Sequence, residues 1–309
     1  MSFSDPEGEK VGGGPPVAVP ARPADGHKGT FGTVIVVGGS ATMPGAAAMA
    51  ARAAFRSGAG LVKVAAPRDV MGAVLAIEPS ATGVLLEGAE RLMDALRGAD
   101  RDGRAALAVG PGLGGGADAV LPPLLNDGRA MVLDADALNA LAGSGRRLRR
   151  TGPTVLTPHP GEFGRLARAV HLRFDLESEA GRRAAATDLA KAHEAVVVLK
   201  GAGTVVSDGR QAWVNGTGNV AMAAAGSGDV LTGLIAALLA GGMAAWDAAR
   251  LGVYLHGVSG DGWAREHGDR GLLARELADG LPRAFACAAG RAGKAALVAD
   301  QVGVSAEPL

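Results

Sequence analysis

The segment Gly226-Ser227-Gly228-Asp229 combines small, flexible residues with one carboxylate and runs directly into the apolar stretch 230–239. That stretch predicts a buried helix, and the free N–H groups of a helix's first turn attract anions. Gly226 and Gly228 would let the backbone approach a phosphate closely, and Asp229 would be placed to take a proton from a nearby hydroxyl. The segment therefore predicts a phosphoryl-transfer site. In the plainer alternative, Asp229 only caps the helix and the glycines make a turn.

Two further residues that can do chemistry follow predicted strands. His159 stands between Pro158 and Pro160, whose rings fix the backbone and therefore the position of the imidazole. A histidine held in this way is expected to contact a ligand. Lys200, followed by Gly201, could meet a phosphate or simply pair with a carboxylate, and the sequence leaves both alternatives open.

Other polar residues carry weaker indications. Asp134 and Asp136 follow a strand and could hold Mg²⁺ indirectly or hydrogen-bond a loop, and Asp136 could instead cap a helix that begins at Ala137. Glu162 could be the first-turn acid of the next helix and nothing more. His256 lies within a predicted helix and is expected to be a satisfied core histidine.

The elements that must position these residues are indicated by continuous apolar runs, which mark strands buried on both faces, with helices between them. Predicted strands cover 33–37, 61–65, 106–109, 131–133, 154–156 and 195–199, and predicted helices cover 45–56, 176–193, 229–241, 247–263 and 272–291. Residues 204–206 and 211–214, joined through an Asp-Gly turn, predict an antiparallel hairpin. In an open parallel sheet, ligands bind outside the carboxyl ends of the strands. Nearly all the unusual loops follow such ends, so we expect one shared site.

The composition bounds the class of protein. The 309 residues are 48% hydrophobic and only 3% aromatic, with 49 glycines, which fits a parallel α/β protein with a core of Ala, Val and Leu. Lys+Arg and Asp+Glu are both 31, so nothing indicates an electrostatic surface for nucleic acid. The stretch 230–246 is shorter than the ~20 residues of a membrane span, so no membrane partner is expected. The single cysteine, Cys287, excludes an intrachain disulfide and favours a cytoplasmic location.

The domain organisation is expected to be simple. Residues 1–24 are polar and rich in Gly and Pro, lack the apolar core of a signal peptide, and predict a flexible leader. One domain is expected over 25–295, followed by a C-terminal tail at 296–309. His27 precedes the first strand and could fold over the site.

A competing hypothesis comes from the stretch 110–115, which formally matches G-x-G-x-x-G after a strand. Asp134 follows at about the right distance for a ribose-binding acid, so the pattern would indicate a Rossmann oxidoreductase. However, Pro111 removes an N–H group from the loop, and Pro122 with Pro123 would break the helix that should hold a pyrophosphate. We therefore prefer a glycine-rich ligand loop, with a plain tight turn as the structural alternative.

Taken in order, the motifs resemble the ribokinase-like superfamily and, more narrowly, the ADP- or ATP-dependent NAD(P)H-hydrate dehydratases, a family of nicotinamide nucleotide repair enzymes. The resemblance runs from about His27 to Arg291, and its sharpest parts are Thr-Pro-His-Pro-Gly-Glu at 157–162 and Gly-Ser-Gly-Asp at 226–229. It also rests on the motifs at 27–29, 36–40, 44–47, 56–60, 110–114, 134–138 and 200–201. It implies a three-layer α/β/α sandwich with a central, mostly parallel sheet and an antiparallel hairpin near its edge.

The family pattern also implies roles for individual residues. Ala46, Gly112 and His159 would line the hydrated dinucleotide, and Asp229 would lie beside the reacting hydroxyl as the catalytic residue. The nucleotide that donates phosphate would contact Lys200, Gly201, Ala202, Gly203, Thr204, Gly226, Ser227 and Gly228. Mg²⁺ would shield the phosphates, and no residue is assigned as a direct metal ligand.

The implied reaction is the dehydration of the S-epimer of NADH hydrate or NADPH hydrate, driven by ADP or ATP. Hydroxide leaves poorly from the hydrated ring, and phosphorylation would create a better leaving group while Asp229 takes the hydroxyl proton. Only about 26 residues precede His27, so we expect the epimerase domain that is fused in many relatives to be absent. Relatives without it favour ADP. The resemblance also implies a homo-oligomer, with a tetramer as one option.

Three other hypotheses stay open at this point. A small-molecule kinase of the same superfamily, acting on a thiazole or pyrimidine alcohol, would keep the Gly-Ser-Gly-Asp motif. The Rossmann oxidoreductase is the second. The third is a catalytically silent nucleotide-binding module, and the intact Asp229 argues against it.

Overall fold

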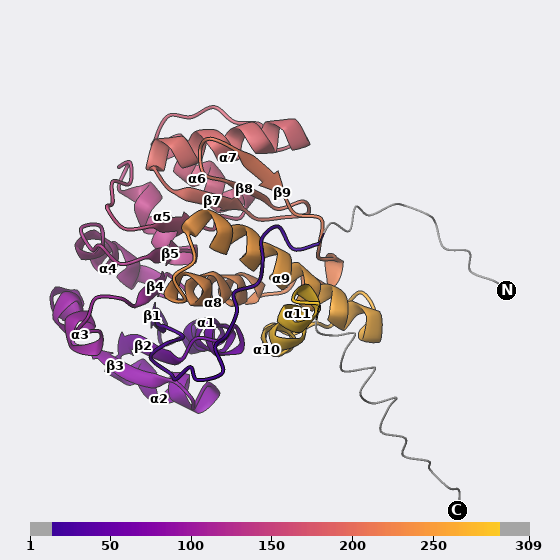
Figure 1. Cartoon of the computed structure of the whole chain (residues 1–309). Coiled ribbons are helices and arrows are strands. Elements are labelled where there is room, and N and C mark those ends of the chain that lie inside the picture. Colours follow the sequence, from indigo (N-terminus) through magenta and orange to yellow (C-terminus); the bar gives the residue numbers. More distant parts are fainter. Residues whose placement is uncertain (1–13, 291–309) are drawn as a thin grey trace, which may run out of the picture.

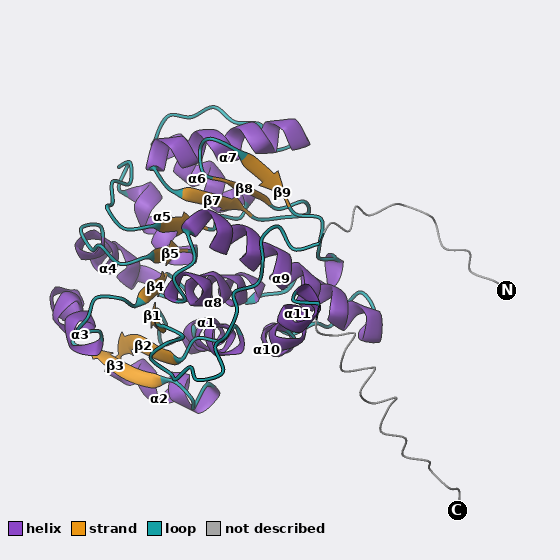
Figure 2. Cartoon of the chain, in the orientation of Figure 1, coloured by secondary structure: helices purple, strands orange, loops and turns teal. Residues whose placement is uncertain are grey.

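The structure is a computed structural model that describes residues 14–290. Within these residues, nine strands form one sheet in the order β3-β2-β1-β4-β5-β6-β7-β8-β9 (Figures 1 and 2). The strands are β1 (Thr33–Val37), β2 (Leu61–Pro67), β3 (Thr82–Leu86), β4 (Ala106–Val109), β5 (Met131–Leu133), β6 (Thr154–Leu156), β7 (Val196–Leu199), β8 (Val205–Ser207) and β9 (Ala212–Val214). β1 to β7 pair in parallel, whereas β8 and β9 join antiparallel at one end.

Helices cover both faces of this sheet (Figure 1). They are α1 (Pro44–Arg56), α2 (Arg68–Ile77), α3 (Leu92–Ala99), α4 (Ala117–Leu124), α5 (Ala135–Gly143), α6 (Pro160–Ala169), α7 (Glu179–His193), α8 (Ser227–Ala240), α9 (Ala245–His267), α10 (Ala274–Asp279) and α11 (Leu281–Ala288). α1, α2 and α8 to α11 pack against the face that carries Val34 and Val36, and α3 to α7 pack against the face that carries Ile35 and Val37. Right-handed crossovers require this division, because the chain moves from β1 towards β3 and then returns past β1 to β4.

α8 lies in the middle of its face and packs against both α1 and α9 (Figure 1). Its residues from Val230 to Leu239 are all buried. A Cβ atom at Gly233 would lie 2.0 Å from the carbonyl oxygen of Ala50 in α1, so only glycine lets the two helix backbones approach this closely. α1 meets α8 with a row of buried alanines. Small side chains therefore build a dense core in a chain with few aromatic residues.

The fold class expected from the sequence is confirmed, including the antiparallel hairpin at one end of the sheet. Each predicted strand is present to within two residues. β3 was not predicted; it is an edge strand whose side chains are mostly exposed. The single helix expected at 272–291 is wrong over its described part, because α10 ends at Asp279, α11 begins at Leu281, and Gly280 separates them. Pro282 has no N–H group to continue the first helix, and it is tolerated where a new helix starts.

The expectation that Pro122 and Pro123 break a helix is also wrong. Both lie inside α4, within its last turn. A proline there gives up only its own backbone donor, and α4 ends at Leu124, directly after the pair.

The domain boundaries expected at residues 24 and 295 stay predictions. Residues 1–13 and 291–309 lie outside the described residues, and they include the first half of the expected leader and the whole expected tail. Among residues 14–290, no helix is both long enough and apolar enough to cross a membrane.

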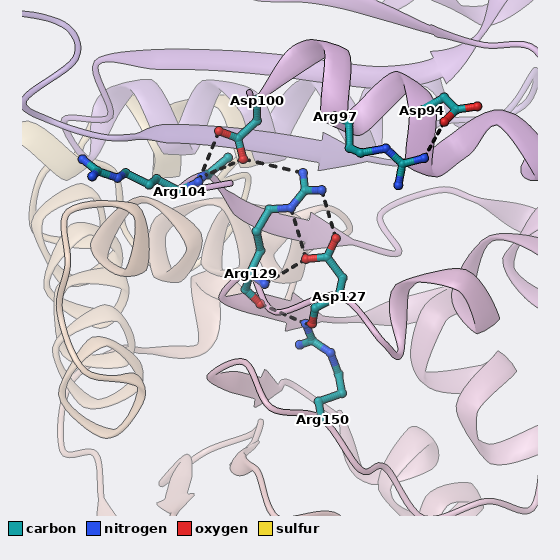
Figure 3. Close-up of polar contacts among 8 residues, drawn as sticks. Asp94, Arg97, Asp100, Arg104, Asp127, Arg129 and Arg150 are labelled. Atoms are coloured by element: carbon teal, nitrogen blue, oxygen red, sulfur yellow. Dashed lines mark hydrogen bonds and ion pairs between the residues drawn. The ribbon is translucent and has the colours of Figure 1, made fainter. Parts of the chain in front are cut away.

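A group of charged side chains lies where the chain enters β4, β5 and β6, and we call it the amino-edge cluster: Asp100, Asp127, Arg129 and Arg150 (Figure 3). The buried Arg129 contacts both oxygens of Asp127, at 2.9 Å from Nη2 and 3.1 Å from Nε. Its Nη1 lies 3.6 Å from Asp100. Arg150 donates to the backbone carbonyls of Asp127 and Arg129. Two cations and two carboxylates therefore offset one another.

Candidate active site

Ala46 and Gly112 lie at the opposite edge, beside the carboxyl ends of the parallel strands. β1 has β2 on one side and β4 on the other, so the connections that leave β1 and β4 diverge here, and ligands bind at such switch points in open α/β sheets. Ala46 lies in the first turn of α1 after β1, and Gly112 follows β4. A Cβ atom at Gly112 would lie 3.0 Å from the Cβ of Ala46. The two predicted substrate residues are therefore neighbours at the switch point.

A cavity of about 660 Å³ opens further along the same edge, beside β7 to β9. Most of the residues predicted to contact a nucleotide line it, namely Lys200, Gly201, Ala202, Gly203, Thr204, Ser227 and Gly228, together with His159. Gly226 lies at the adjoining turn but is not among the lining residues. The structure thus brings together segments that are far apart in the sequence.

The start of α8 forms one wall of this cavity. Gly226 precedes the helix with a φ angle of 86°, a left-handed conformation that glycine adopts without strain. Among the described residues no side chain caps the helix. The first-turn N–H groups at Gly228 and Asp229 have no intrahelical partner, so the positive end of a buried helix faces the site.

A second group of charges surrounds this helix start, and we call it the carboxyl-edge cluster: Asp134, Glu162, Lys200 and Asp229. Asp134 is almost completely buried, and its carboxylate lies 2.7 Å from Lys200 Nζ and 2.7 Å from the hydroxyl of Thr232 in α8. Although burial opposes its charged form, Lys200 and the hydroxyl donors hold the pKa of Asp134 below its usual range. Lys200 thus pairs with a carboxylate, which was one of its two sequence alternatives, and it also lines the cavity. Its contact with a phosphate stays a prediction.

Glu162 does more than begin a helix. Its Oε2 accepts a hydrogen bond from the backbone N–H of His159 at 2.9 Å, which completes a capping box for α6. The same buried carboxylate lies 3.9 Å from Lys200 Nζ. Burial is the main cause that raises the pKa of Glu162, and the nearby charge of Asp134 adds to it. His159 keeps its ring half exposed, with Nε2 3.4 Å from Glu162.

Asp229 is half-buried in the first turn of α8. It does not line the 660 Å³ cavity. Burial, followed by the negative charge of Asp134, raises its pKa to about 7, with further contributions from Asp136 and Glu162 and opposition from Lys200. Because these carboxylates follow β5 and β6, Asp229 faces the part of the edge between the cavity and the switch point.

Asp136 bonds a loop, as one of its sequence alternatives proposed. Its Oδ2 accepts a hydrogen bond from Gly114 N at 2.8 Å, which ties the loop after β4 to the start of α5. The expectation that Asp136 caps a helix beginning at Ala137 is wrong, because α5 already begins at Ala135 and Asp134 holds the N-cap position. Within residues 14–290, no group of three His, Cys, Asp or Glu side chains is arranged to hold a metal ion.

His27 lies away from the site, contrary to expectation. The segment that follows it touches the far end of α8, because a Cβ atom at Gly32 would lie 2.1 Å from the carbonyl oxygen of Ala240. The backbone of Lys28 lies similarly close to Gly60, just before β2. Residues that precede a parallel strand lie at its amino edge, so position in the chain alone argued against a role over the carboxyl edge.

Several cavity residues were not predicted from the sequence. They are Asn215, Gly216, Thr217, Gly218, Asn219, Val220, Met222, Ala223, Leu231, Val253, His256 and Gly257. Residues 215–219 form a run of small polar residues between the hairpin and α8, and such a run could have indicated a ligand loop. His256 is buried as expected, but it also lines the cavity.

A family model described as NAD(P)H-hydrate dehydratase matches residues 34–283. The chain belongs to the NAD(P)H-hydrate dehydratase family. It is 43% identical over 280 residues to the bifunctional NAD(P)H-hydrate repair enzyme Nnr of Moorella thermoacetica, with 85% of this chain and 51% of that protein covered. The chain therefore spans about half the length of that relative. It is 37% identical over 271 residues to the ADP-dependent (S)-NAD(P)H-hydrate dehydratase of Bacillus subtilis, with 86% and 94% covered.

A comparison with a solved structure agrees with this family assignment. The ADP/ATP-dependent NAD(P)H-hydrate dehydratase from Bacillus subtilis, co-crystallised with ATP and Mg²⁺, matches with a TM-score of 0.74 at 35% identity, covering 88% of this chain and 95% of that chain. The resemblance drawn from the ordered motifs is confirmed, and the fold of this family member is ribokinase-like. These relatives favour the dehydratase family over a thiazole or pyrimidine alcohol kinase and over a Rossmann oxidoreductase.

Proposed function

We propose that the protein dehydrates the S-epimer of NADH hydrate or NADPH hydrate to the reduced dinucleotide, with ADP or ATP as the phosphate donor. One observation carries the proposal beyond family membership. The uncapped start of α8 stands between a cavity large enough for a nucleotide and a carboxyl group, Asp229, whose pKa is raised to about 7. Phosphorylation of a hydroxyl requires a site that binds the donor's phosphates and, next to it, a group that accepts the hydroxyl proton.

The shape of the carboxyl edge supports the following proposed arrangement of the two substrates. The donor nucleotide occupies the cavity, with its phosphates directed at the start of α8 and at the ammonium group of Lys200. The hydrated dinucleotide lies along the switch point, against Ala46 and Gly112, and reaches His159. Asp229 stands between the two sites, and its position beside the α8 start brings it next to the reacting hydroxyl.

The first chemical step is phosphoryl transfer. Asp229 takes the proton from the ring hydroxyl, the hydroxyl oxygen forms a bond to the terminal phosphorus, and the bond to the leaving nucleotide oxygen breaks. The N–H groups at the start of α8 stabilise the negative charge on the transferred group. In the second step, the ring nitrogen's lone pair forms a C=N bond and phosphate leaves with the C–O electron pair. Loss of a proton from the neighbouring ring carbon restores the dihydronicotinamide.

Magnesium fits this site only as a companion of the nucleotide. Asp134 already binds Lys200 and Thr232 through both of its oxygens, so it is not free to act as a ligand. Mg²⁺ typically keeps several waters and binds through one or two carboxylates together with substrate phosphates. Asp136, whose Oδ2 also accepts from Gly114 N, is the carboxylate of this edge that would hold it, and the ion would neutralise charge on the phosphates.

The proposal is tested by mixing the protein with enzymatically prepared S-NADH hydrate and following the return of dihydronicotinamide absorbance. Return is expected only when ADP or ATP is added, and the comparison of the two donors settles the preference, for which we propose ADP. Conversion of a thiazole or pyrimidine alcohol to its phosphate, with no return of absorbance from the hydrate, would contradict the dehydratase and support the kinase.

We propose two further properties, a cytoplasmic location and a homo-oligomeric state. The single cysteine supports a cytoplasmic location. The exposed apolar side chains of Val220 and Leu273, which are 69% and 50% exposed, support a homo-oligomer, and we propose a homotetramer. Light scattering on the purified protein gives the mass that tests this assignment.

A further inference from the structure

The stretch His256-Gly257-Val258-Ser259-Gly260-Asp261 of α9 turns four residues, His256, Gly257, Gly260 and Asp261, towards the cavity residues, and these four have no role in the chemistry described above. His256 lines the nucleotide cavity and is almost fully buried. Its Nε2 lies 3.0 Å from the carbonyl oxygen of Ser227. Burial lowers the pKa of His256 to about 4, so the ring is neutral and its Nε2–H donates to that carbonyl. α9 therefore holds the first residue of α8.

Asp261 holds the opposite wall of the cavity. Its Oδ2 accepts a hydrogen bond from Gly218 N at 2.9 Å, and its Oδ1 accepts one from Asn219 Nδ2 at 2.9 Å. Two turns earlier on the same helix, the carbonyl oxygen of Tyr254 accepts a hydrogen bond from the hydroxyl of Thr217 at 3.0 Å. Three consecutive cavity residues, 217–219, are thus tied to α9 by polar contacts.

The glycines of this face let the wall approach the helix. A Cβ atom at Gly257 would lie 2.1 Å from Thr217 Oγ1 and 2.8 Å from Gly218 N. A Cβ atom at Gly260 would lie 2.3 Å from Met222 Sδ, at the end of a flexible side chain. Glycine inside a helix normally costs stability. The close approach of backbone at Gly257 gives a physical reason for its presence there.

We infer that α9 sets the width of the nucleotide cavity, with Gly257 and Asp261 as positioning residues for the 217–219 wall and His256 as the positioning residue for the start of α8. None of the three needs to touch the transferred phosphoryl group. The inference rests on the proposed function, because it takes the cavity to be the site of the donor nucleotide. It assigns nucleotide affinity to a helix that follows the glycine-rich motif in the sequence and packs against it.

The sharpest test compares two glycines of α9. Gly257→Ala would force the 217–219 wall outward, whereas Gly262→Ala adds a methyl group that would lie 3.9 Å from the side chain of Arg265, an ordinary contact distance. Calorimetric titration with ADP and with ATP should show the Kd rising about tenfold or more in Gly257→Ala. Gly262→Ala should keep the wild-type Kd. Both should melt within about 4 °C of the wild type, because alanine favours the helix.

A second pair keeps the result interpretable if Gly257→Ala does not fold. Asp261→Asn preserves shape but places an amide against the N–H donors of Gly218 and Asn219, and the Kd for ADP should rise about tenfold. Asp247→Asn, in the first turn of the same helix and not among the cavity residues, should leave the Kd unchanged. In turnover assays, Asp261→Asn should raise KM for the donor far more than it lowers kcat.

The outcomes separate the inference from the function on which it rests. If the wild type binds neither ADP nor ATP, the nucleotide assignment fails and the inference fails with it. If the wild type binds ADP and both Gly257→Ala and Asp261→Asn bind it equally well, the inference alone is overturned. A fall in melting temperature with an unchanged Kd would likewise show that this face of α9 serves stability only.

Discussion

The amino-edge and carboxyl-edge clusters lie at opposite ends of the same parallel strands, and they handle charge in opposite ways. In the amino-edge cluster, Arg129 and Arg150 offset Asp100 and Asp127, and Arg129 meets Asp127 through two parallel contacts (Figure 3). In the carboxyl-edge cluster, Lys200 is the single cation among three carboxyl groups, those of Asp134, Glu162 and Asp229.

The difference shows how one sheet can place stabilising ion pairs at one edge and a proton-accepting group at the other. A buried charge that is paired and hydrogen-bonded keeps its ordinary charge state, but a surplus of like charges raises the pKa of the least compensated group. Burial is the main cause that raises the pKa values of Asp229 and Glu162, and the negative charge of Asp134, which takes the closest contact to Lys200, adds to it. The carboxyl-edge cluster therefore contains a carboxyl group, that of Asp229, which can accept and release a proton near neutral pH.

The largest effect is expected from Asp229→Asn, which removes the proton acceptor from the carboxyl-edge cluster. Turnover of S-NADH hydrate should fall roughly 10²–10⁴-fold, as is typical for the loss of a general base. The Kd for ADP should stay close to the wild-type value, because Asp229 does not line the cavity. Initial rates and calorimetric titration measure the two quantities. Retained turnover would mean that another group takes the proton.

Arg129→Met, in the amino-edge cluster, should lower stability and leave catalysis unchanged. It would leave two buried carboxylates without their cation and lower the free energy of unfolding by about 3–5 kcal/mol, while kcat at a temperature below melting stays unchanged. Arg97→Met is the matched control, because its partner Asp94 is exposed (Figure 3) and such pairs contribute only ~0–1 kcal/mol. Denaturant unfolding of both variants provides the comparison. Equal losses would show that the amino-edge cluster has no special role.

The pH dependence of stability should distinguish the two edges. The folded protein raises the pKa of Asp229 to about 7, so it holds a proton that the unfolded chain has already released. The stabilisation from this proton is present at low pH and is lost as the pH rises through 7. The wild type should therefore lose up to about 4 kcal/mol relative to Asp229→Asn between pH 4 and pH 8. Denaturant titrations at both pH values check this, and parallel behaviour of the two proteins would contradict it.

Glu162→Gln should produce the smallest effect, because it removes one surplus charge but keeps an acceptor for His159 N. The pKa of Asp229 should fall, since Glu162 contributes to raising it, by less than about one unit. The acidic limb of the pH–rate profile would then shift to lower pH with little change in the plateau. An unshifted limb would indicate that Glu162 serves only to cap α6.

The fold was largely predictable because its determinants are local. Each buried parallel strand is a continuous apolar run, and the hairpin carries an Asp-Gly turn, so residues such as Val34 to Val37 or Asp208-Gly209 indicate their own structure. The errors arose where local signals conflict with packing. Gly280 and Pro282 divide a run that looks helical throughout, and β3 is an edge strand without the burial that marks the others.

The candidate site was predictable only where its residues follow strands. Lys200 and His159 were found because loops after parallel strands meet at one edge, and Gly228 was found from the glycine-rich start of a predicted helix. The partners of Asp134 could not be deduced, since its contact with Thr232 joins positions 98 residues apart. The cavity wall at 217–219 and its support from Asp261 depend in the same way on how α9 packs, which no short motif records.

The most direct test of the account is the pH–rate profile of kcat/KM for S-NADH hydrate at saturating ADP. Because Asp229 must be deprotonated to accept the hydroxyl proton, kcat/KM should rise about tenfold per pH unit below an apparent pKa of about 7 and then level off. A profile that stays flat from pH 5 to pH 8 would contradict the claim that Asp229, with a pKa raised by its surroundings in the carboxyl-edge cluster, is the proton acceptor.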